Sequence, residues 1–307
     1  MLVCALAVAA LAPAILAPPA HAQPAPLQLA ALAPAPADDA RRAVAIGPSG
    51  EVYEPDGKGA WIRHHRITTA TTISLAVRSG GDVVASGEGV VYRLAPNGWS
   101  AIRLHQKDKA KLAGGARAVA AVGRQLFALD RLAGGEPAKL GAAPGDVLLV
   151  GAGASIVVAT DRGLFRLDGG RLTPIAAPRR ARVLVGDQWA ITDGGAVDLR
   201  SGKTTPWPAG AAVEAAAAGP DDRLIAVARA GGKLELLTLR AGKLERAPID
   251  VALPGDPVGV AVDRAGRAVV ALRDGRLAVR DGAAWTTATI AEQLPAPQPD
   301  PPPAASR

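Results

Sequence analysis

The sequence predicts an all-β fold built from repeated four-stranded sheets. Its apolar segments are short, roughly four to six residues each, and Gly, Asp, Pro or Asn bounds most of them, which is typical of strands. Helical periodicity is scarce after residue 40. With 307 residues, 49% of them hydrophobic, the chain is long enough for one large all-β domain or two smaller ones.

One pattern recurs along the chain. It consists of an apolar strand, a turn, a second apolar strand, a Gly-rich turn, a third strand and a last, more polar strand that often carries Trp. The copies begin at Ala43, Ser74, Ala118, Val147, Arg182, Glu214 and Gly259. The six steps between them average about 36 residues, which suits four strands of about five residues joined by short turns.

Such a repeat has a clear consequence for packing. Four antiparallel strands form a twisted sheet with two apolar faces, and radial packing of several sheets buries both faces of each. We therefore predict a β-propeller of seven four-stranded blades over residues 41–292. Six or eight blades stay open as alternatives, because the third copy is short.

The turn and tryptophan positions agree with this fold. Asp-Gly and Gly-Gly pairs tolerate the positive φ of tight hairpins. Trp61, Trp99 and Trp285 each stand near the start of the last strand of a copy, and Trp207 is placed similarly. We expect these rings to pack between blades and not to form an aromatic binding surface. Trp189, in a second strand, is the exception.

Residues 1–22 have the pattern of a secretory signal peptide. Leu2 to Ala17 is an apolar stretch, and Ala20-His21-Ala22 places small residues at a cleavage site. No Lys or Arg precedes the stretch, so the true start could lie further upstream; a membrane anchor is the alternative, which the prolines disfavour. We expect cleavage, no membrane span afterwards and a periplasmic or secreted protein.

Two further segments flank the predicted propeller. Residues 23–40 are rich in Ala and Pro and are predicted to be a linker, in which "PLQLAAL" could add a strand that closes the ring. Residues 293–307 form a Pro-rich tail that we expect to be disordered. The one cysteine, Cys4, lies in the signal segment, so the mature chain would have no disulfide and no thiolate site.

The formal net charge of +7 bears on the chemical class of partner that the protein binds. It suggests an acidic partner, but the 35 basic residues are interspersed with 28 acidic ones, which favours an ordinary solvated surface. The densest basic segment, His105 to Arg117, is interpreted as a loop between copies. It lacks interleaved aromatic residues, so nucleic acid is disfavoured, while a polyanion whose binding weakens with salt stays an alternative.

Candidate catalytic residues are scarce. The sequence has no G-x-S-x-G, H-E-x-x-H or P-loop motif, and we interpret "GAGAS" at Gly151–Ser155 as a hairpin turn. The weak metal-ligand candidates are His64, His65 and His105; the first two are adjacent in a strand and could bind one ion only with a bulge.

A second hypothesis concerns the aspartates of the repeats. They occupy hairpin corners, where their side chains can bond to the backbone, and several could converge into an acidic rim. These residues are Asp161, Asp168, Asp193, Asp263, Asp274 and Asp281.

The last copy also resembles known repeats. "PVGVAVDRAGRAVVALRDGRLAV" is similar to the repeat of NHL-type propellers, and with its Trp ending it resembles two-component-regulator-type propeller repeats. The resemblance implies a fold and a role in recognition. Lactonase-like propellers, which this chain resembles in architecture, hold a divalent ion with Glu, Asn and Asp side chains. The chain has one asparagine, Asn97, in a turn tripeptide, which counts against that activity.

The sequence therefore predicts an exported, non-catalytic β-propeller without a cofactor, a monomer that binds a protein or polysaccharide. We expect specificity in the irregular inserts Gln106–Arg117 and Arg131–Gly145. The alternative is a metal-dependent hydrolase or lyase with its site in the central channel.

Overall fold

The structure is a computed structural model that describes strands throughout the repeat region and most turns after residue 110. The described residues are 31–34, 43–46, 51–55, 61–66, 74–77, 83–86, 90–95, 98–104, 110–115, 117–129, 137–176, 180–219, 222–250, 256–262, 266–274 and 276–289. The predicted signal peptide and tail lie outside them. The described residues contain no helix, and hence none of the length and hydropathy that crossing a membrane requires.

Within the described residues, the strands form seven four-stranded antiparallel sheets, each made of four consecutive strands. The innermost strands are β1 (Ala31–Pro34), β5 (Ser74–Val77), β9 (Lys111–Ala113), β13 (Val147–Ala152), β17 (Val183–Val185), β21 (Ala212–Ala218) and β25 (Pro257–Val262). The second strands are β2 (Ala43–Ile46), β6 (Val83–Ser86), β10 (Val119–Val122), β14 (Ile156–Thr160), β18 (Trp189–Ile191), β22 (Leu224–Ala230) and β26 (Ala268–Leu272).

The other two strands of each sheet lie further from the axis. The third strands are β3 (Glu51–Pro55), β7 (Val90–Ala95), β11 (Gln125–Ala128), β15 (Gly163–Asp168), β19 (Gly195–Asp198), β23 (Lys233–Arg240) and β27 (Arg276–Asp281). The outermost strands are β4 (Trp61–Arg66), β8 (Gly98–Arg103), β12 (Ala138–Ala142), β16 (Arg171–Ile175), β20 (Thr204–Pro206), β24 (Lys243–Pro248) and β28 (Ala284–Thr289).

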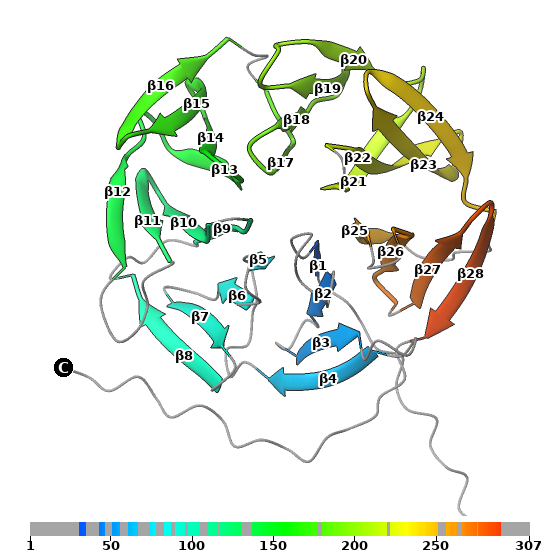
Figure 1. The fold of residues 1–307 in the computed structure, drawn as a ribbon, viewed down its shortest axis with the longest axis horizontal. Coiled ribbons are helices and arrows are strands. Elements are labelled where there is room, and N and C mark those ends of the chain that lie inside the picture. The colour runs from blue at the N-terminus through cyan, green and yellow to red at the C-terminus, as the bar shows by residue number, and fades with distance from the viewer. Residues whose placement is uncertain are drawn as a thin grey trace, which may run out of the picture.

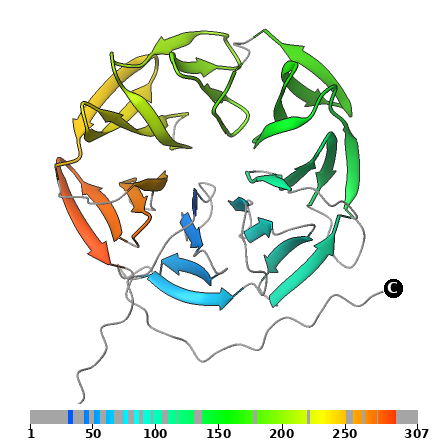
Figure 2. The same ribbon diagram turned by 180° about the vertical axis from the view of Figure 1, so that it is seen from behind.

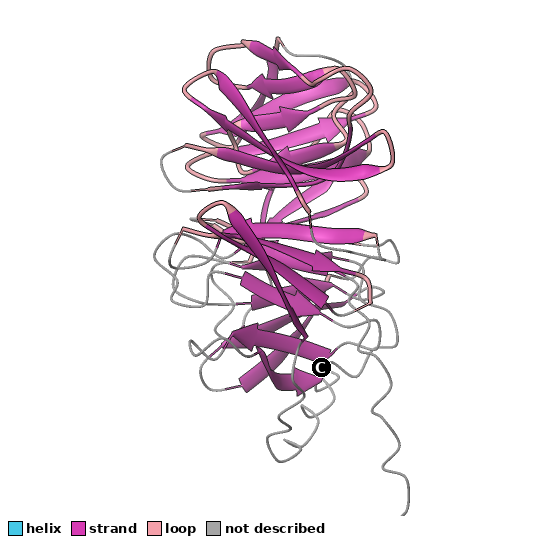
Figure 3. Cartoon of the chain, turned by 90° about the vertical axis from the view of Figure 1, so that its right-hand side faces the viewer, coloured by secondary structure: helices cyan, strands magenta, loops and turns pink. Residues whose placement is uncertain are grey.

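The sheets stand around a common axis and form a ring (Figure 1 and, from behind, Figure 2). Seen edge-on, the ring is thinner along its axis than across it, and strands fill it (Figure 3). This is a β-propeller, so the predicted all-β propeller fold is confirmed, and each sheet contains one of the predicted copies. We number the sheets as blades in chain order.

The two faces of the ring carry different turns. Because every blade repeats the same up-and-down path, all innermost strands start at the same face. We call it the connector face: it carries the connections between blades, such as 143–146 and 207–211, and the turns between second and third strands. The opposite face carries the turns between first and second strands, such as 153–155, and between third and fourth strands, such as 199–203.

The second strands show why these sequences form blades. In β14 all five residues are buried, and alternate side chains pack on opposite neighbours: Ile156 and Val158 contact the third blade, while Val157 and Ala159 contact the fifth. A strand enclosed on both faces needs a continuous apolar run. Outermost strands such as β24 are mostly exposed, and their sequences are more polar. Burying each Val, Leu or Ile contributes about 1.5–3 kcal/mol, so these interfaces between blades supply most of the stability.

Two tryptophans confirm the predicted packing between blades. Trp285 lies in an apolar cluster shared by the sixth and seventh blades, and its indole Nε1 donates to the carbonyl oxygen of Pro248 in β24 at 2.9 Å. Trp207 lies in the cluster shared by the fifth and sixth blades, together with Trp189. Its Nε1 donates to the carbonyl oxygen of Thr192 at 2.9 Å. Each ring therefore fills apolar space while its N–H group has a partner.

At the opposite face, the inner turns of neighbouring blades approach closely. The buried Asp187 carboxylate of the fifth blade accepts hydrogen bonds from the amide (2.8 Å) and hydroxyl (3.0 Å) of Ser155 in the fourth. The turn at Gly151–Ser155 is a hairpin turn, as predicted. A Cβ at Gly151 would stand well under 3.0 Å from the carbonyl oxygen of Gly186, so this contact requires glycine.

Two strands lie where the sequence predicts none, and a third, β1, overlaps the segment "PLQLAAL", which the sequence predicts could add a strand. β1 lies inside the predicted linker 23–40, so the first sheet begins ahead of residue 41. β9 lies inside the segment interpreted as a loop, His105–Arg117, and β12 lies inside the insert Arg131–Gly145. All three are edge strands, which pair on one side only and need less apolar sequence than strands inside a sheet. Residues 106–109, 116 and 131–136 of the two inserts lie outside the described residues.

The first and last blades close the ring without sharing a sheet. The first sheet contains β1 to β4 and the last contains β25 to β28, so no described sheet combines strands from both ends of the chain. β1 lies beside β25 across the closure. Within the described residues, the first and last blades therefore adjoin through contacts between separate sheets.

Candidate binding face

Three innermost strands contain an irregularity at the same place, close to the connector face. In β13, β21 and β25 the register with the second strand shifts early in the strand, so one residue of the inner strand is left outside the ladder. These residues are Leu148, Glu214 and Val258. A bulge turns the extra side chain out of the regular alternation, and bulges are common beside functional sites.

The three positions carry different side chains. Leu148 is the one exposed large hydrophobic side chain among those that the structure describes, with 52% of its surface accessible. Glu214 is acidic, and Val258 is partly buried. The connector face thus presents an apolar side chain and a charged one near the axis, a combination that protein interfaces often use.

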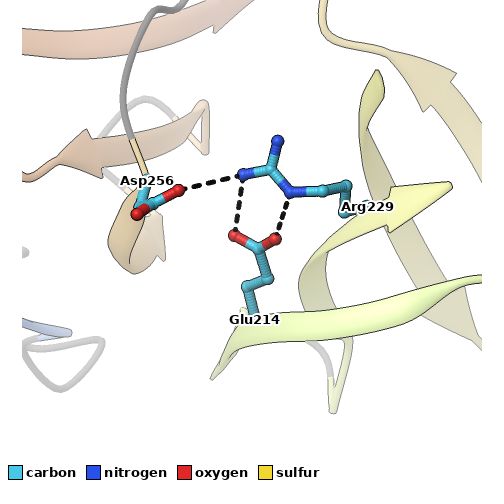
Figure 4. A network of polar contacts seen from close by, with 3 residues as sticks. All are labelled: Glu214, Arg229 and Asp256. Carbon is cyan, nitrogen blue, oxygen red and sulfur yellow. Dashed lines mark hydrogen bonds and ion pairs between the residues drawn. The ribbon is translucent and has the colours of Figure 1, made fainter. Parts of the chain in front are cut away.

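Glu214 belongs to a network of polar contacts between the sixth and seventh blades (Figure 4). Arg229, near the end of β22, donates from Nε to Glu214 Oε1 at 2.6 Å and from Nη2 to Glu214 Oε2 at 3.4 Å. Its Nη2 also reaches Asp256 Oδ1, just ahead of β25, at 3.4 Å. The carbonyl oxygen of Asp256 accepts a hydrogen bond from the amide of Arg273, which holds its backbone in place. The guanidinium therefore bridges two blades.

The network holds one fixed positive charge between two carboxylates. The hydrogen bond with Glu214 raises the pKa of the Arg229 guanidinium; partial burial works against this, and the charges of Glu214 and Asp256 add to it. Arg229 therefore stays protonated at any ordinary pH. Figure 4 shows its remaining nitrogen, Nη1, directed away from both carboxylates. The site thus offers a partner an oriented donor beside the exposed carboxylate of Asp256.

The exposed pair of Arg229 with Asp256 contributes little to the stability of the ring. The Arg229 and Asp256 side chains are 36% and 74% exposed, and exposed pairs are worth about 0.2–1 kcal/mol each. The apolar cluster between the same two blades buries more than a dozen side chains and contributes far more. An oriented charge pair that contributes little to folding is suited to recognition.

The three predicted histidine candidates lie where the structure describes no side chain. His64 and His65 lie in β4, where the register with β3 shifts so that Val52 faces His65 and Tyr53 faces Arg63, which leaves His64 unpaired. This is the bulge that shared ligation would need, although the structure describes only the backbone there. His105 lies outside the described residues. Within the described ranges no three His, Cys, Asp or Glu side chains gather as a metal site would require.

The structure divides the aspartates of the hypothetical acidic rim between the two faces, with three of them at one face and two at the other. Asp161, Asp193 and Asp274 lie in turns of the connector face, whereas Asp168 and Asp281 end third strands at the opposite face. Asp263 lies outside the described residues. The reason is the repeat itself, because successive hairpin corners alternate between the two faces of a blade.

Several of these aspartates have arginine partners. Asp193 pairs with Arg182, Asp274 with Arg276, and Asp281 with Arg267 at 3.9 Å. Their charges are therefore offset locally.

Asp274 makes the stability of the seventh blade sensitive to acid. Burial raises the pKa of its carboxyl group, but hydrogen bonds and the charge from Arg276 outweigh burial, so the pKa lies below its ordinary value. A carboxyl group whose pKa is lowered by folding stabilises the fold above its unfolded pKa, about 3.9, and loses this effect as the pH falls through the folded value.

We therefore expect Asp274→Asn to be less stable than the wild type at pH 7. The difference in the free energy of unfolding should shrink as the pH falls below about 4. Urea unfolding of both proteins at pH 7, 5, 4 and 3 measures it. A difference that stays constant or grows as the pH falls would contradict this account.

Sequence reasoning did not find Glu214, Arg229 or Asp256. One signal was available: Glu214 is the one charged residue in the run "AGAAVEAAAAG". A charge inside an apolar innermost strand costs free energy unless a partner meets it.

Comparisons with known proteins agree with the fold. No protein-family model matches the chain, and no curated protein matches it. Among solved structures, a streptogramin B lyase is similar at 14% identity with a TM-score of 0.65, over 82% of this chain and 93% of that one. The WD40 β-propeller domain of Doa1 is similar at 12% identity and a TM-score of 0.58, over 82% and 92%. YCF48 from Cyanidioschyzon merolae is similar at 17% identity and a TM-score of 0.58, over 83% and 95%. At these identities the likeness shows the propeller fold and nothing of the function.

Proposed function

We propose that the protein is an exported binding scaffold that holds a protein partner on its connector face. The observation that carries the proposal is the repeated bulge of the innermost strands, which sets Leu148, Glu214 and Val258 outside the ladder at one face. Arginine is among the residue types that anchor protein interfaces, and the exposed leucine adds apolar surface that a partner can bury. The predicted signal peptide supports export.

A matched pair of ion pairs allows a sharp test. Arg229 and Arg246 lie in the same blade, and each binds a glutamate of a neighbouring strand through two nitrogens: Arg229 binds Glu214 at the connector face, and Arg246 binds Glu235 on the outer strands. Arg229→Gln and Arg246→Gln therefore remove comparable contacts at two places. Leu148→Glu places a charge at the proposed face, and its exposure predicts little effect on folding.

The full chain and the three variants are used as baits for proteins of the parent cell envelope, and captured proteins are quantified by mass spectrometry. We expect a protein captured by the wild type and by Arg246→Gln to fall at least about tenfold with Leu148→Glu and with Arg229→Gln, which corresponds to about 1.4 kcal/mol or more. Equal capture by all four baits, or no protein enriched by the wild type, would reject the proposal. The alternative function, a metal-dependent hydrolase or lyase with its site in the central channel, stays a prediction that rests on architecture alone.

A further inference from the structure

The opposite face of the fifth and sixth blades carries a cluster of cations that the connector-face proposal does not involve. The third and fourth strands of each blade meet there in a tight turn, 199–203 in the fifth blade and 241–242 in the sixth. Four basic residues flank or form these turns, and all four are exposed. We call Arg200, Lys203, Arg240 and Lys243 the basic turn pair.

The two turns lie against one another. A Cβ built on Gly242 would lie 3.2 Å from the Nζ atom of Lys203, so the ammonium group of the fifth blade rests over the turn of the sixth. Gly242 has a φ of +77° and no side chain, which leaves room for the lysine. In the same hairpin, Arg240 and Lys243 are directly opposite in register. Positive side chains of two blades are thus brought together by the fold.

The acidic residues nearby only partly balance these charges. Asp198 is engaged within its own turn, where it accepts from the amide of Arg200 at 2.9 Å and from the hydroxyl of Ser201 at 2.8 Å. Asp222 pairs with Arg200 at 3.6 Å. Lys203 and Lys243 have no carboxylate partner among the residues that the structure describes. The ammonium groups of Lys203 and Lys243 therefore remain for a partner.

We propose that the basic turn pair binds a linear acidic polysaccharide. The cations are spread over two adjacent turns and enclose no buried polar group, so they fit an extended chain with repeated anions and not a single small anion. The turns expose no large apolar side chain that could enter a lipid surface, since Leu199 is only 4% exposed. They contain no aromatic side chain on which nucleic-acid bases could stack.

The test uses the full chain with heparin as the probe. The dissociation constant is measured at several NaCl concentrations for the wild type, for Lys203→Gln/Lys243→Gln, and for the control Lys139→Gln/Lys233→Gln. The control removes the same charge from two exposed lysines, one in the third blade and one at the connector face. Thermal unfolding of all three proteins confirms that they are equally folded.

We expect wild-type binding to weaken steeply with salt. The basic-turn double variant should bind at least tenfold more weakly at low salt, and its slope of log K against log salt should fall by about 1 for each lysine removed. The control should match the wild type. An equal loss in the control would show that total charge and not this surface is responsible, and would overturn the proposal.

Further arms separate this proposal from its alternatives. Uncharged dextran should not bind. Single-stranded DNA and vesicles of phosphatidylglycerol in phosphatidylcholine should bind more weakly than heparin at equal salt, and tighter binding to either would reject the polysaccharide. Leu148→Glu and Arg229→Gln, at the other face, should bind heparin like the wild type, so failure of one proposal leaves the other standing.

Discussion

Gly151→Ala should strongly destabilise the ring, because the new methyl group would collide with the backbone of the next blade. The alanine Cβ would stand well under 3.0 Å from the carbonyl oxygen of Gly186 and 3.1 Å from Cβ of Leu184. Neither atom is the end of a flexible side chain, so the fifth blade as a whole would have to move. Overpacking costs about 1–3 kcal/mol and sometimes more, and we expect the upper end of that range. Urea or thermal unfolding measures the loss.

Gly194→Ala is the matched control. Gly194 lies in a turn of the fifth blade, has no atom within 4 Å of an added Cβ and does not have a positive φ. The same substitution there should leave the free energy of unfolding unchanged within about 0.5 kcal/mol. The two substitutions differ in what the methyl group meets. Equal stability of the two variants would mean that the fourth and fifth blades are not packed as closely as described.

Trp285→Ala should cost about 3–5 kcal/mol, the usual range for removing a buried Trp. The ring is 8% exposed and packs in the cluster that joins the sixth and seventh blades. Its loss leaves a cavity between blades and leaves the carbonyl oxygen of Pro248 without its indole donor. A domain of this class has about 5–15 kcal/mol of stability in total, so the effect should be plain in urea unfolding.

Trp285→Phe separates the two contributions. Phenylalanine keeps much of the apolar contact but cannot donate to Pro248, so it should cost clearly less than alanine and still more than the 1 kcal/mol or so of one hydrogen bond. Leu148→Ala, at an exposed side chain, should leave stability almost unchanged. Should Trp285→Ala unfold at the same urea concentration as the wild type, the seventh blade would not depend on this packing.

Much of the fold could be predicted from the sequence, because the features that determine it are repeated. The spacing of about 36 residues, the apolar second strands and the Gly-rich corners recur often enough to be seen in one chain. The role of Trp285 followed from its fixed place in the repeat. β9 and β12 were missed because edge strands need little apolar sequence; "KLA" carries almost no strand signal. β1 was predicted in part, since "ALAP" begins with the last two residues of "PLQLAAL".

The candidate sites could not be predicted in the same way. Glu214, Arg229 and Asp256 are not part of the repeated pattern. They lie far apart in the sequence, so no motif joins them. Their contact depends on the register of β21 with β22 and on the start of β25 beside them. The same holds for Lys203 and Gly242, which meet only because two turns of neighbouring blades are adjacent. A sequence reveals what is repeated more readily than what is unique.

The way the ring closes has a consequence for how such chains evolve. Every described sheet consists of four consecutive strands, so the unit of sequence repeat is also a complete unit of hydrogen bonding. Duplication or deletion of one such segment in the gene adds or removes a whole blade without dividing any sheet. In a ring closed by strand exchange between its ends, the terminal blade is shared and its two parts must change together. In this ring such a change would leave the hydrogen bonds of every other sheet intact, while the packing between adjacent blades would have to adjust.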